Sequence, residues 1–199
     1  ETAYKPLINT NMTGKIIIIA APSGCGKSTI INALLEGGDL NLGFAVSATT
    51  RPPREGERDG VNYYFMTEEQ FRDHITEGDF VEFEEVYPGR FYGTLRSEVE
   101  RITGDGHNII LDLDVNGALG VKQLYGDRAM TVFITPPSLD ELRRRLEFRG
   151  TESAEVIDVR VDRAAYEMSR AAEFDKCVVN DRLDQAVTQT HNLIEAFAR

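Results

Sequence analysis

An apolar strand that runs directly into a glycine-rich loop, followed by a helix, is the feature that most constrains this chain. Residues 15–20 read KIIIIA, a β-branched run that predicts a buried parallel strand. Residues 20–29 read AAPSGCGKST, and the apolar spacing of residues 27–38 predicts a helix that stops at a Gly-Gly pair. Small residues let the backbone approach a ligand closely, and a lysine at the start of a helix favours an anionic one.

The second half of the loop matches the phosphate-binding pattern G-x-x-x-x-G-K-[ST]. Gly26, Lys27 and Ser28 fill its last three positions, whereas Ala21 stands at the first glycine. Backbone N–H groups and the positive helix end can hold phosphates, Lys27 can reach the β- and γ-phosphates, and the Ser28 hydroxyl can bind Mg²⁺. A glycine-rich turn with a surface lysine would leave the flanking strand and helix unexplained. The predicted ATP-binding loop is Ala21, Pro22, Ser23, Gly24, Cys25, Gly26, Lys27, Ser28 and Thr29.

Strands and helices alternate along most of the chain. This alternation predicts an α/β fold with a parallel sheet flanked by helices, as in P-loop NTPases. A strand-rich insert at about residues 47–95 interrupts the alternation, and Thr67 and Gln70 form a capping-box pattern inside it. The expected strands are 15–20, 44–50, 80–87, 129–137 and 175–181, with a strand followed by a helix over 107–124. The other expected helices are 27–38, 67–78, 138–150, 153–174 and 182–198.

Composition and charge exclude several other classes of protein. The 199 residues are 41% hydrophobic and 28% charged, which is ordinary for a globular domain. A formal net charge of −11 argues against a general nucleic-acid or membrane-surface binder. Cys25 and Cys177 lack metal-ligand or disulfide spacing, and the sequence shows no signal peptide pattern and no run of about 20 apolar residues, so we expect a cytoplasmic protein. Residues 1–13 read as an N-terminal extension.

Two aspartates end the strand in the segment IILDLD. Strand alternation puts Asp112 and Asp114 on the same side. In P-loop enzymes a strand-terminal aspartate lies near Mg²⁺. We therefore expect Asp112 at the metal, directly or through water, with Asp114 beside it. Strand-end aspartates are also frequent helix caps, and the pattern alone leaves that alternative open.

A second anion site is indicated by the segment SATTRPPREGE. Arg51 and Arg54 flank a stiff Pro-Pro pair in a region that is otherwise acidic. Guanidinium groups match phosphate oxygens in a bidentate manner, so this pair is a candidate site for the phosphoryl acceptor. Tyr63 and Tyr92 can each donate a phenol hydroxyl to the same anion. Surface arginines and core tyrosines are the alternatives.

Eight separated segments occur in the order and spacing of guanylate kinases, and in this respect the chain resembles that family. They are APSGCGKST, SATTRPPREGE, GVNYYF, FVEFEEV, FYGT, ILDLDVNGA, RRRLEFRG and VVND, and the resemblance runs from about Gly14 to the C-terminus. It implies MgATP-dependent phosphorylation of GMP and dGMP to give GDP and ADP, in guanine nucleotide supply. It also implies a core (14–46, 96–138, 164–199), a GMP-binding sub-domain (47–95) and a lid (139–163).

The resemblance also implies roles for individual residues. Those for the GMP phosphate are Arg51, Arg54, Tyr63 and Tyr92. Those for the guanine side are Ser47, Glu82, Thr94 and Asp114, and Asp112 is a further GMP-binding residue. Those for catalysis are Lys27, Arg51, Arg149 and Arg160, with Arg145 as a further lid arginine. Asn180 matches a residue that contacts the adenine edge of ATP.

The chemistry of guanine agrees with a carboxylate and a hydroxyl at this site. Guanine presents N1–H and N2–H₂ donors beside the O6 acceptor, so Glu82 can accept two donors while Ser47 donates to O6. Adenine has no N1–H and would leave the carboxylate unpaired. We expect the apolar neighbours Phe80, Val81 and Phe83 to shield this carboxylate.

Two other functions stay in competition with this one. Non-catalytic guanylate-kinase-like modules bind protein partners, but they typically lose the loop lysine or its glycines, and Lys27 is present here. A sugar-phosphate or other small-molecule kinase could use the same scaffold, but Glu82 together with the arginine–tyrosine set favours a nucleotide. One residue more than in the family pattern lies between Glu82 and Tyr92, in VYPGRF. Self-association into a homodimer stays open.

Overall fold

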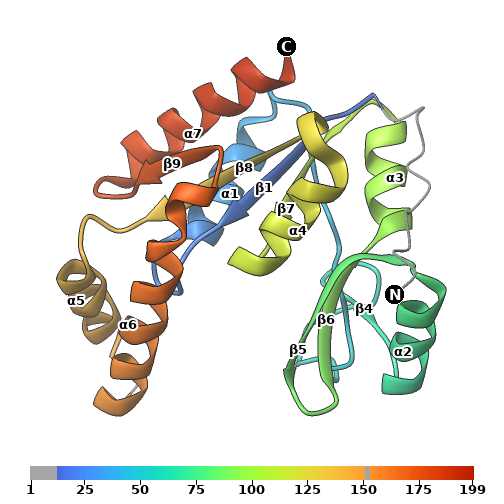
Figure 1. Cartoon of the computed structure of the whole chain (residues 1–199), viewed down its shortest axis with the longest axis horizontal. Coiled ribbons are helices and arrows are strands. Elements are labelled where there is room, and N and C mark those ends of the chain that lie inside the picture. Colours follow the sequence, from blue (N-terminus) through green and yellow to red (C-terminus); the bar gives the residue numbers. More distant parts are fainter. Residues whose placement is uncertain (1–12, 151–152) are drawn as a thin grey trace.

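A five-stranded parallel sheet with the strand order β2-β7-β1-β8-β9 forms the centre of the molecule (Figure 1). The structure is a computed structural model that describes residues 13–150 and 153–199, apart from the side chain of Arg149. The strands are β1 (Ile16–Ala20), β2 (Leu42–Phe44), β7 (Asn108–Asp112), β8 (Ala129–Thr135) and β9 (Lys176–Val179). All five residues of β1 are completely buried, as expected for a strand covered on both faces. The predicted α/β fold is confirmed.

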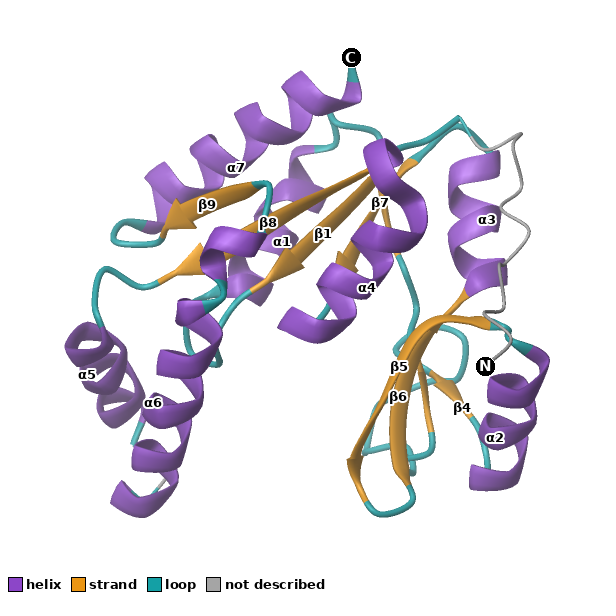
Figure 2. Ribbon diagram, in the orientation of Figure 1, coloured by secondary structure: helices purple, strands orange, loops and turns teal. Residues whose placement is uncertain are grey.

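Helices cover both faces of this sheet (Figure 2). Ile17 and Ile19 point into an apolar cluster with α1 and α7, whereas Ile16 and Ile18 point into a cluster with α3 and α4. These helices are α1 (Lys27–Gly37), α3 (Arg96–Gly104), α4 (Val115–Tyr125) and α7 (Leu183–Ala198). Short 3₁₀ turns are η1 (Gly126–Arg128) and η2 (Ala171–Glu173). Within the described ranges, no helix combines the length and the apolar character needed to cross a membrane.

A second, four-stranded sheet with the order β4-β3-β6-β5 forms the insert. Its elements are β3 (Ala48–Thr49), β4 (Tyr64–Phe65), α2 (Glu68–Glu77), β5 (Phe80–Tyr87) and β6 (Arg90–Leu95). The capping box of α2 is confirmed, since the Thr67 side chain accepts from Gln70 N and the Gln70 side chain accepts from Thr67 N. Phe71, Phe80 and Phe91 pack in an apolar cluster that is separate from the clusters of the parallel sheet.

The strand expected over residues 44–50 is wrong. Phe44 ends β2 in the parallel sheet, and Ala48 begins β3 in the insert. The chain leaves one sheet and enters the other between these two residues, so a single apolar run serves two sheets. Helix α3 was not among the expected elements, because four of its nine residues, RSEVERITG, are charged. Residues 1–12 of the expected N-terminal extension lie outside the described residues.

Two helices, α5 (Leu139–Arg149) and α6 (Ala154–Ser169), pack on each other on the β8–β9 side of the parallel sheet, across from the insert (Figure 1). Ser138 accepts the N–H of Glu141 at 3.1 Å and caps α5, as its position in the sequence predicts. Leu142 and Leu146 from α5 share an apolar cluster with α6 and with Cys25 of the glycine-rich loop. This cluster holds the helical pair beside that loop.

Candidate active site

The loop between β1 and α1 has the backbone conformation that an anion site needs. Gly24 and Gly26 adopt φ values of 96° and 82°, which residues with a side chain rarely adopt. A Cβ atom on Gly26 would also lie 2.7 Å from Asn180 Nδ2. Within the described part of the chain, no side chain caps α1 and no acidic residue lies in its first turn. Its first N–H groups and positive dipole end are therefore available to phosphate.

Lys27, the first residue of α1, points at the end of β7. Its Nζ atom forms an ion pair with Asp112 and donates a hydrogen bond to Leu113 O at 3.3 Å. The two charged side chains keep 21% and 30% of their surface exposed, so both remain accessible to a ligand. Asp114 accepts the N–H of Gly117 at 2.7 Å and caps α4, which is the helix-capping alternative that the sequence left open.

Three cavities surround the glycine-rich loop and the insert, and the largest of these three, of about 950 Å³, lies between that loop, the end of β7 and α6. Arg160 Nη1 donates to Ser23 Oγ at 2.6 Å, which brings this arginine of α6 to the loop. Tyr87 in β5 and Val159 in α6 line the cavity from the two arms of the molecule seen in Figure 1, and both side chains are largely exposed. Arg149 ends α5, and its side chain lies outside the described residues.

A second cavity, of about 570 Å³, lies between the same loop and α5. Asn180 lines it and is only 6% exposed, and its Nδ2 atom donates to Cys25 O at 2.8 Å. Arg145 also lines it and donates to Asn180 O at 2.8 Å and to Asp181 O at 3.3 Å. The residue expected at the adenine edge thus also ties β9 to the phosphate loop. No local pattern signals this bond, because 155 residues separate the two partners.

A third cavity, of about 330 Å³, lies between the insert and the end of β7. The predicted residues that line it are Ser47, Tyr63, Glu82, Tyr92, Asp112 and Asp114. Buried Thr94 meets this group through its Oγ1 atom, which donates to Glu82 Oε1 at 2.7 Å. Asp112, Leu113 and Asp114 line both this cavity and the largest one, so the two cavities meet at the end of β7.

Glu82 is a largely desolvated carboxylate in the third cavity. Burial, the largest effect, raises its pKa to about 7, the charge of Asp114 adds to this, and the hydrogen bond from Thr94 opposes it. A Cβ atom on Gly117 would lie 3.3 Å from Glu82 Oε2, so the carboxylate sits against the first turn of α4. The expected shielding by Phe83 is wrong, because that ring is 47% exposed.

The two arginines of the predicted phosphate site differ in their surroundings. Arg51 is 7% exposed, and its guanidinium lies 5.2 Å from the Tyr63 ring centroid and 5.7 Å from that of Phe65. It forms a bidentate ion pair with Glu57, with N···O distances of 2.8 and 2.9 Å. Arg54 is exposed. The sequence reasoning missed Glu57, although it lies six residues after Arg51 in the same turn-rich segment.

Glu84 is a further carboxylate that the sequence reasoning missed. The sequence alone gives Glu84 and Glu85 the same interpretation, solvated charge, but Glu84 lines the third cavity. Partial burial and the charge of Asp114 raise the pKa of Glu84, and the charge of Arg163 lowers it. Its position two residues after Glu82 on a strand is the signal that could have found it, because both side chains lie on one face.

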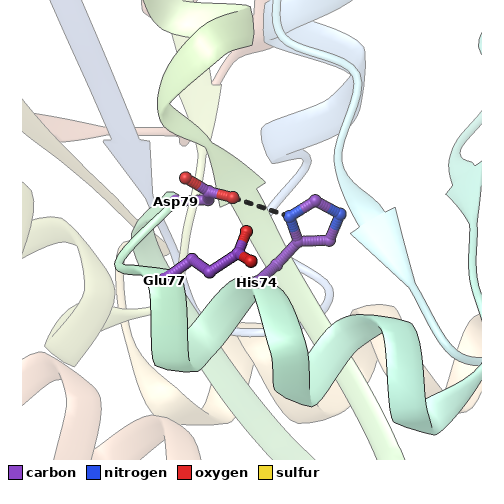
Figure 3. Close-up of side chains that lie close together, drawn as sticks. All are labelled: His74, Glu77 and Asp79. Atoms are coloured by element: carbon purple, nitrogen blue, oxygen red, sulfur yellow. Dashed lines mark hydrogen bonds and ion pairs between the residues drawn. The ribbon is translucent and has the colours of Figure 1, made fainter.

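One cluster of potential metal ligands lies outside these cavities, at the end of α2 (Figure 3). His74 Nδ1 is 2.8 Å from Asp79 Oδ2, and Glu77 lies beside the pair. Asp79 N also donates to His74 O at 3.0 Å, so these contacts close the turn from α2 into β5. We assign the cluster a structural role.

The comparison with known proteins decides the family. The model of the guanylate kinase family matches residues 13–197. The chain belongs to the guanylate kinase family. It is 52% identical to a guanylate kinase of Bacteroides thetaiotaomicron, over 94% of this chain and 91% of that protein. It is 53% identical to a guanylate kinase of Salinibacter ruber, over 92% of this chain and 96% of that protein.

A solved guanylate kinase also shares the fold. The crystal structure of guanylate kinase from Anaplasma phagocytophilum superposes with a TM-score of 0.73 at 32% identity, covering 94% of this chain and 87% of that one. The guanylate kinase match therefore extends over both sheets and the α5–α6 pair, and not only over the phosphate loop.

Proposed function

We propose that the chain transfers the γ-phosphoryl group of ATP to GMP, and to dGMP, giving ADP and GDP. One observation carries this proposal: the phosphate-loop cavity and the Glu82 cavity meet at the Asp112–Asp114 end of β7. A donor triphosphate on the loop and an acceptor nucleotide in the insert would therefore bring their phosphates together at this point. In-line phosphoryl transfer depends chiefly on such positioning and on neutralisation of charge.

Guanine selection is assigned to the inner end of the third cavity. The Glu82 carboxylate would accept N1–H and N2–H₂ of guanine, Ser47 would donate to O6, and Thr94 would keep Glu82 oriented through the 2.7 Å bond. Two donors at the carboxylate would stabilise its charged form, against the burial that raises its pKa. Asp114, fixed as the cap of α4, forms the adjoining wall.

Charge neutralisation is assigned to the cations around the shared end of β7. Lys27, Arg160 and Arg149 would contact the donor phosphates, and Arg51 would act on the acceptor phosphate together with Arg54. The hydroxyl of Ser28 and the carboxylate of Asp112 both line the largest cavity, and oxygen ligands of this kind suit Mg²⁺. They would hold the ion, directly or through water, and the ion would supply charge neutralisation between the β- and γ-phosphates.

The intact phosphate loop supports an enzyme over a protein-binding module. The left-handed glycines and the Lys27–Asp112 pair are what phosphate chemistry needs, and a module that only docks proteins would have no use for them. We also assign the chain a role in recycling GMP and in guanine nucleotide supply, which follows from the proposed reaction.

The decisive experiment is a coupled assay of ADP release with GMP, dGMP, AMP, CMP and UMP as acceptors. We expect kcat/KM for GMP to exceed that for AMP by about 10⁴ or more, because AMP leaves the buried Glu82 carboxylate without donors. Comparable turnover of AMP, or no ADP release with any nucleotide, would overturn the proposal.

A further inference from the structure

Glu57 joins the two arginines of the predicted phosphate site through several hydrogen bonds. Its two carboxylate oxygens accept from Arg51 Nη1 at 2.8 Å and Nη2 at 2.9 Å. One of them also accepts the backbone N–H of Arg54 at 2.7 Å, and Glu57 N donates back to Arg54 O at 3.0 Å. A single carboxylate thus binds the side chain of one arginine and the backbone of the other.

Most of the N–H groups of the Arg51 guanidinium are already used in hydrogen bonds within the protein. A guanidinium has five N–H groups. Two of them go to Glu57, and a third goes from Nη1 to Pro52 O at 2.8 Å. Among the described residues, these contacts leave the Nε–H and one Nη2–H for an anion and for the nearby Tyr92 hydroxyl. Glu57 therefore decides which N–H groups of the guanidinium remain for an anion.

Two neighbouring aromatic rings also pack against the same guanidinium. The Tyr63 and Phe65 rings lie within 6 Å of its carbon atom, at 5.2 and 5.7 Å, and leave it 7% exposed. The hydrogen bonds to Glu57 and Pro52 and the packing of the two rings hold the guanidinium, so little freedom is left to lose when a phosphate binds. Arg54, by contrast, is exposed, and in the described residues no hydrogen bond of its side chain is found; only its backbone is anchored.

We infer that Glu57 is a positioning residue for the phosphate of the acceptor nucleotide. It aims Arg51 and anchors the backbone of Arg54 without contacting the substrate itself, and this inference rests on the proposed function. The carboxylate stays ionised over the whole working range, because the hydrogen bonds from Arg51 and from the Arg54 backbone lower its pKa to about 2. The pair with Glu57 neutralises part of the positive charge of Arg51, but it fixes the orientation of the guanidinium.

The test is Glu57→Gln, with Glu55→Gln as the matched control in the same loop. Glu55 is exposed. We expect Glu57→Gln to raise KM for GMP by about tenfold or more, since a charge-assisted bidentate pair is lost. KM for ATP should stay within about twofold of the wild-type value, and Glu55→Gln should behave as wild type.

Guanosine separates positioning from a general structural role, because it carries the base and ribose but no phosphate. Calorimetry should show that Glu57→Gln weakens GMP binding and leaves guanosine binding unchanged. Equal weakening of both ligands would mean that the insert as a whole is damaged, and unchanged or tighter GMP binding would mean that Glu57 does not aim Arg51. Each of these results overturns the inference.

A double-mutant cycle with Arg51→Ala completes the test. If Glu57 acts through Arg51, adding Arg51→Ala to Glu57→Gln should cost much less GMP affinity than Arg51→Ala costs alone. Additive losses would overturn the inference. A wild-type protein that fails to prefer GMP over AMP would instead refute the proposed function, so the two failures are distinguishable.

Discussion

Lys27 is the residue on which the chemistry of the loop depends most directly. Its ammonium group neutralises the Asp112 carboxylate, and a bound triphosphate would compete for the same charge. We expect Lys27→Ala to lower kcat by about 10² or more, because a preorganised cation contributes several kcal/mol to transition-state stabilisation. Both side chains are partly exposed, so thermal unfolding should change little.

Steady-state kinetics with a melting curve from the same preparation check this expectation. Lys15→Ala is the matched control, because Lys15 lies at the opposite end of β1, where its Nζ atom is 5.0 Å from the Phe197 ring centroid. A folded Lys27→Ala protein with near-normal kcat would contradict the phosphate-loop assignment.

Glu82 should give the base selection a characteristic pH dependence. The ionised carboxylate can accept both guanine donors, whereas the protonated one cannot. Because its pKa in the empty site is about 7, binding below pH 7 must first release a proton. Guanosine affinity should therefore fall about tenfold per pH unit below 7 and level off above it. Guanosine is the probe, because the phosphate of GMP titrates near the same pH.

Calorimetric titrations from about pH 5.5 to about pH 8.5, at steps of about one pH unit, measure this slope. In Glu82→Gln the slope should vanish, and the ratio of kcat/KM for GMP over AMP should collapse. Glu85→Gln is the control, since Glu85 points away from the cavity and accepts the N–H of Gly89 at 2.8 Å. A pH-independent guanosine affinity in the wild type would refute the role of Glu82.

At the scale of elements, α3 attaches the insert to the parallel sheet. Glu98 on this helix is 3% exposed and accepts Val46 N and the Tyr64 hydroxyl, both at 3.2 Å, as well as Arg101 at 2.9 Å. Val46 lies in the segment where the chain passes between the two sheets, and Tyr64 begins β4. Glu98 therefore links the segment between the two sheets, and β4 of the insert, to one helix.

We expect Glu98→Gln to loosen the insert by about 1–3 kcal/mol, because a buried carboxylate that accepts several hydrogen bonds is replaced by an incompletely bonded amide. Hydrogen exchange should speed up in β3–β6 and stay slow in β1 and β8. Glu100→Gln, on the same helix, is the control. An equal rise of the exchange rates in both sheets would show that Glu98 stabilises the whole molecule and not the attachment of the insert.

Local rules predicted the elements that depend on local chemistry. The loop after β1, the capping box at Thr67 and the cap at Ser138 all follow from residues within a few positions of each other. What the sequence did not reveal depends on distant partners. The exchange of sheets after Phe44 follows from strand pairing, and the role of Asn180 follows from a loop 155 residues away. Ser47, Glu82 and Thr94 were expected at the acceptor site from the family resemblance, whereas Glu57 and Glu84 were recognised only in the structure.

For the whole molecule, we expect the insert and the α5–α6 lid to close over both substrates. Tyr87 and Val159 are exposed on the two arms that line the largest cavity, so closure would bring apolar surfaces together and exclude water. Small-angle scattering should show compaction with a bisubstrate inhibitor that joins the two nucleotides. An unchanged radius of gyration would contradict closure.

Closure also predicts how a lid arginine acts. Arg160 lies at the phosphate loop through Ser23 and outside the acceptor cavity. Arg160→Ala should therefore lower kcat by about 10²–10³ and change KM for GMP far less, and Arg149→Ala should show the same pattern. Arg143→Ala is the control, since Arg143 pairs with Asp158 on the outer part of the lid. A pure rise in KM for GMP would contradict this role.

The separate apolar cluster of Phe71, Phe80 and Phe91 has a consequence for how such a chain can diverge. Mutations in the insert that reshape the base-binding pocket change the packing of this small cluster. The strands that carry the phosphate loop pack in other clusters and keep their packing. Substitutions in residues 47–95, in evolution or in the laboratory, can thus change the specificity for the acceptor base and leave the ATP site largely unchanged. The same division makes this segment the natural unit to exchange between related kinases.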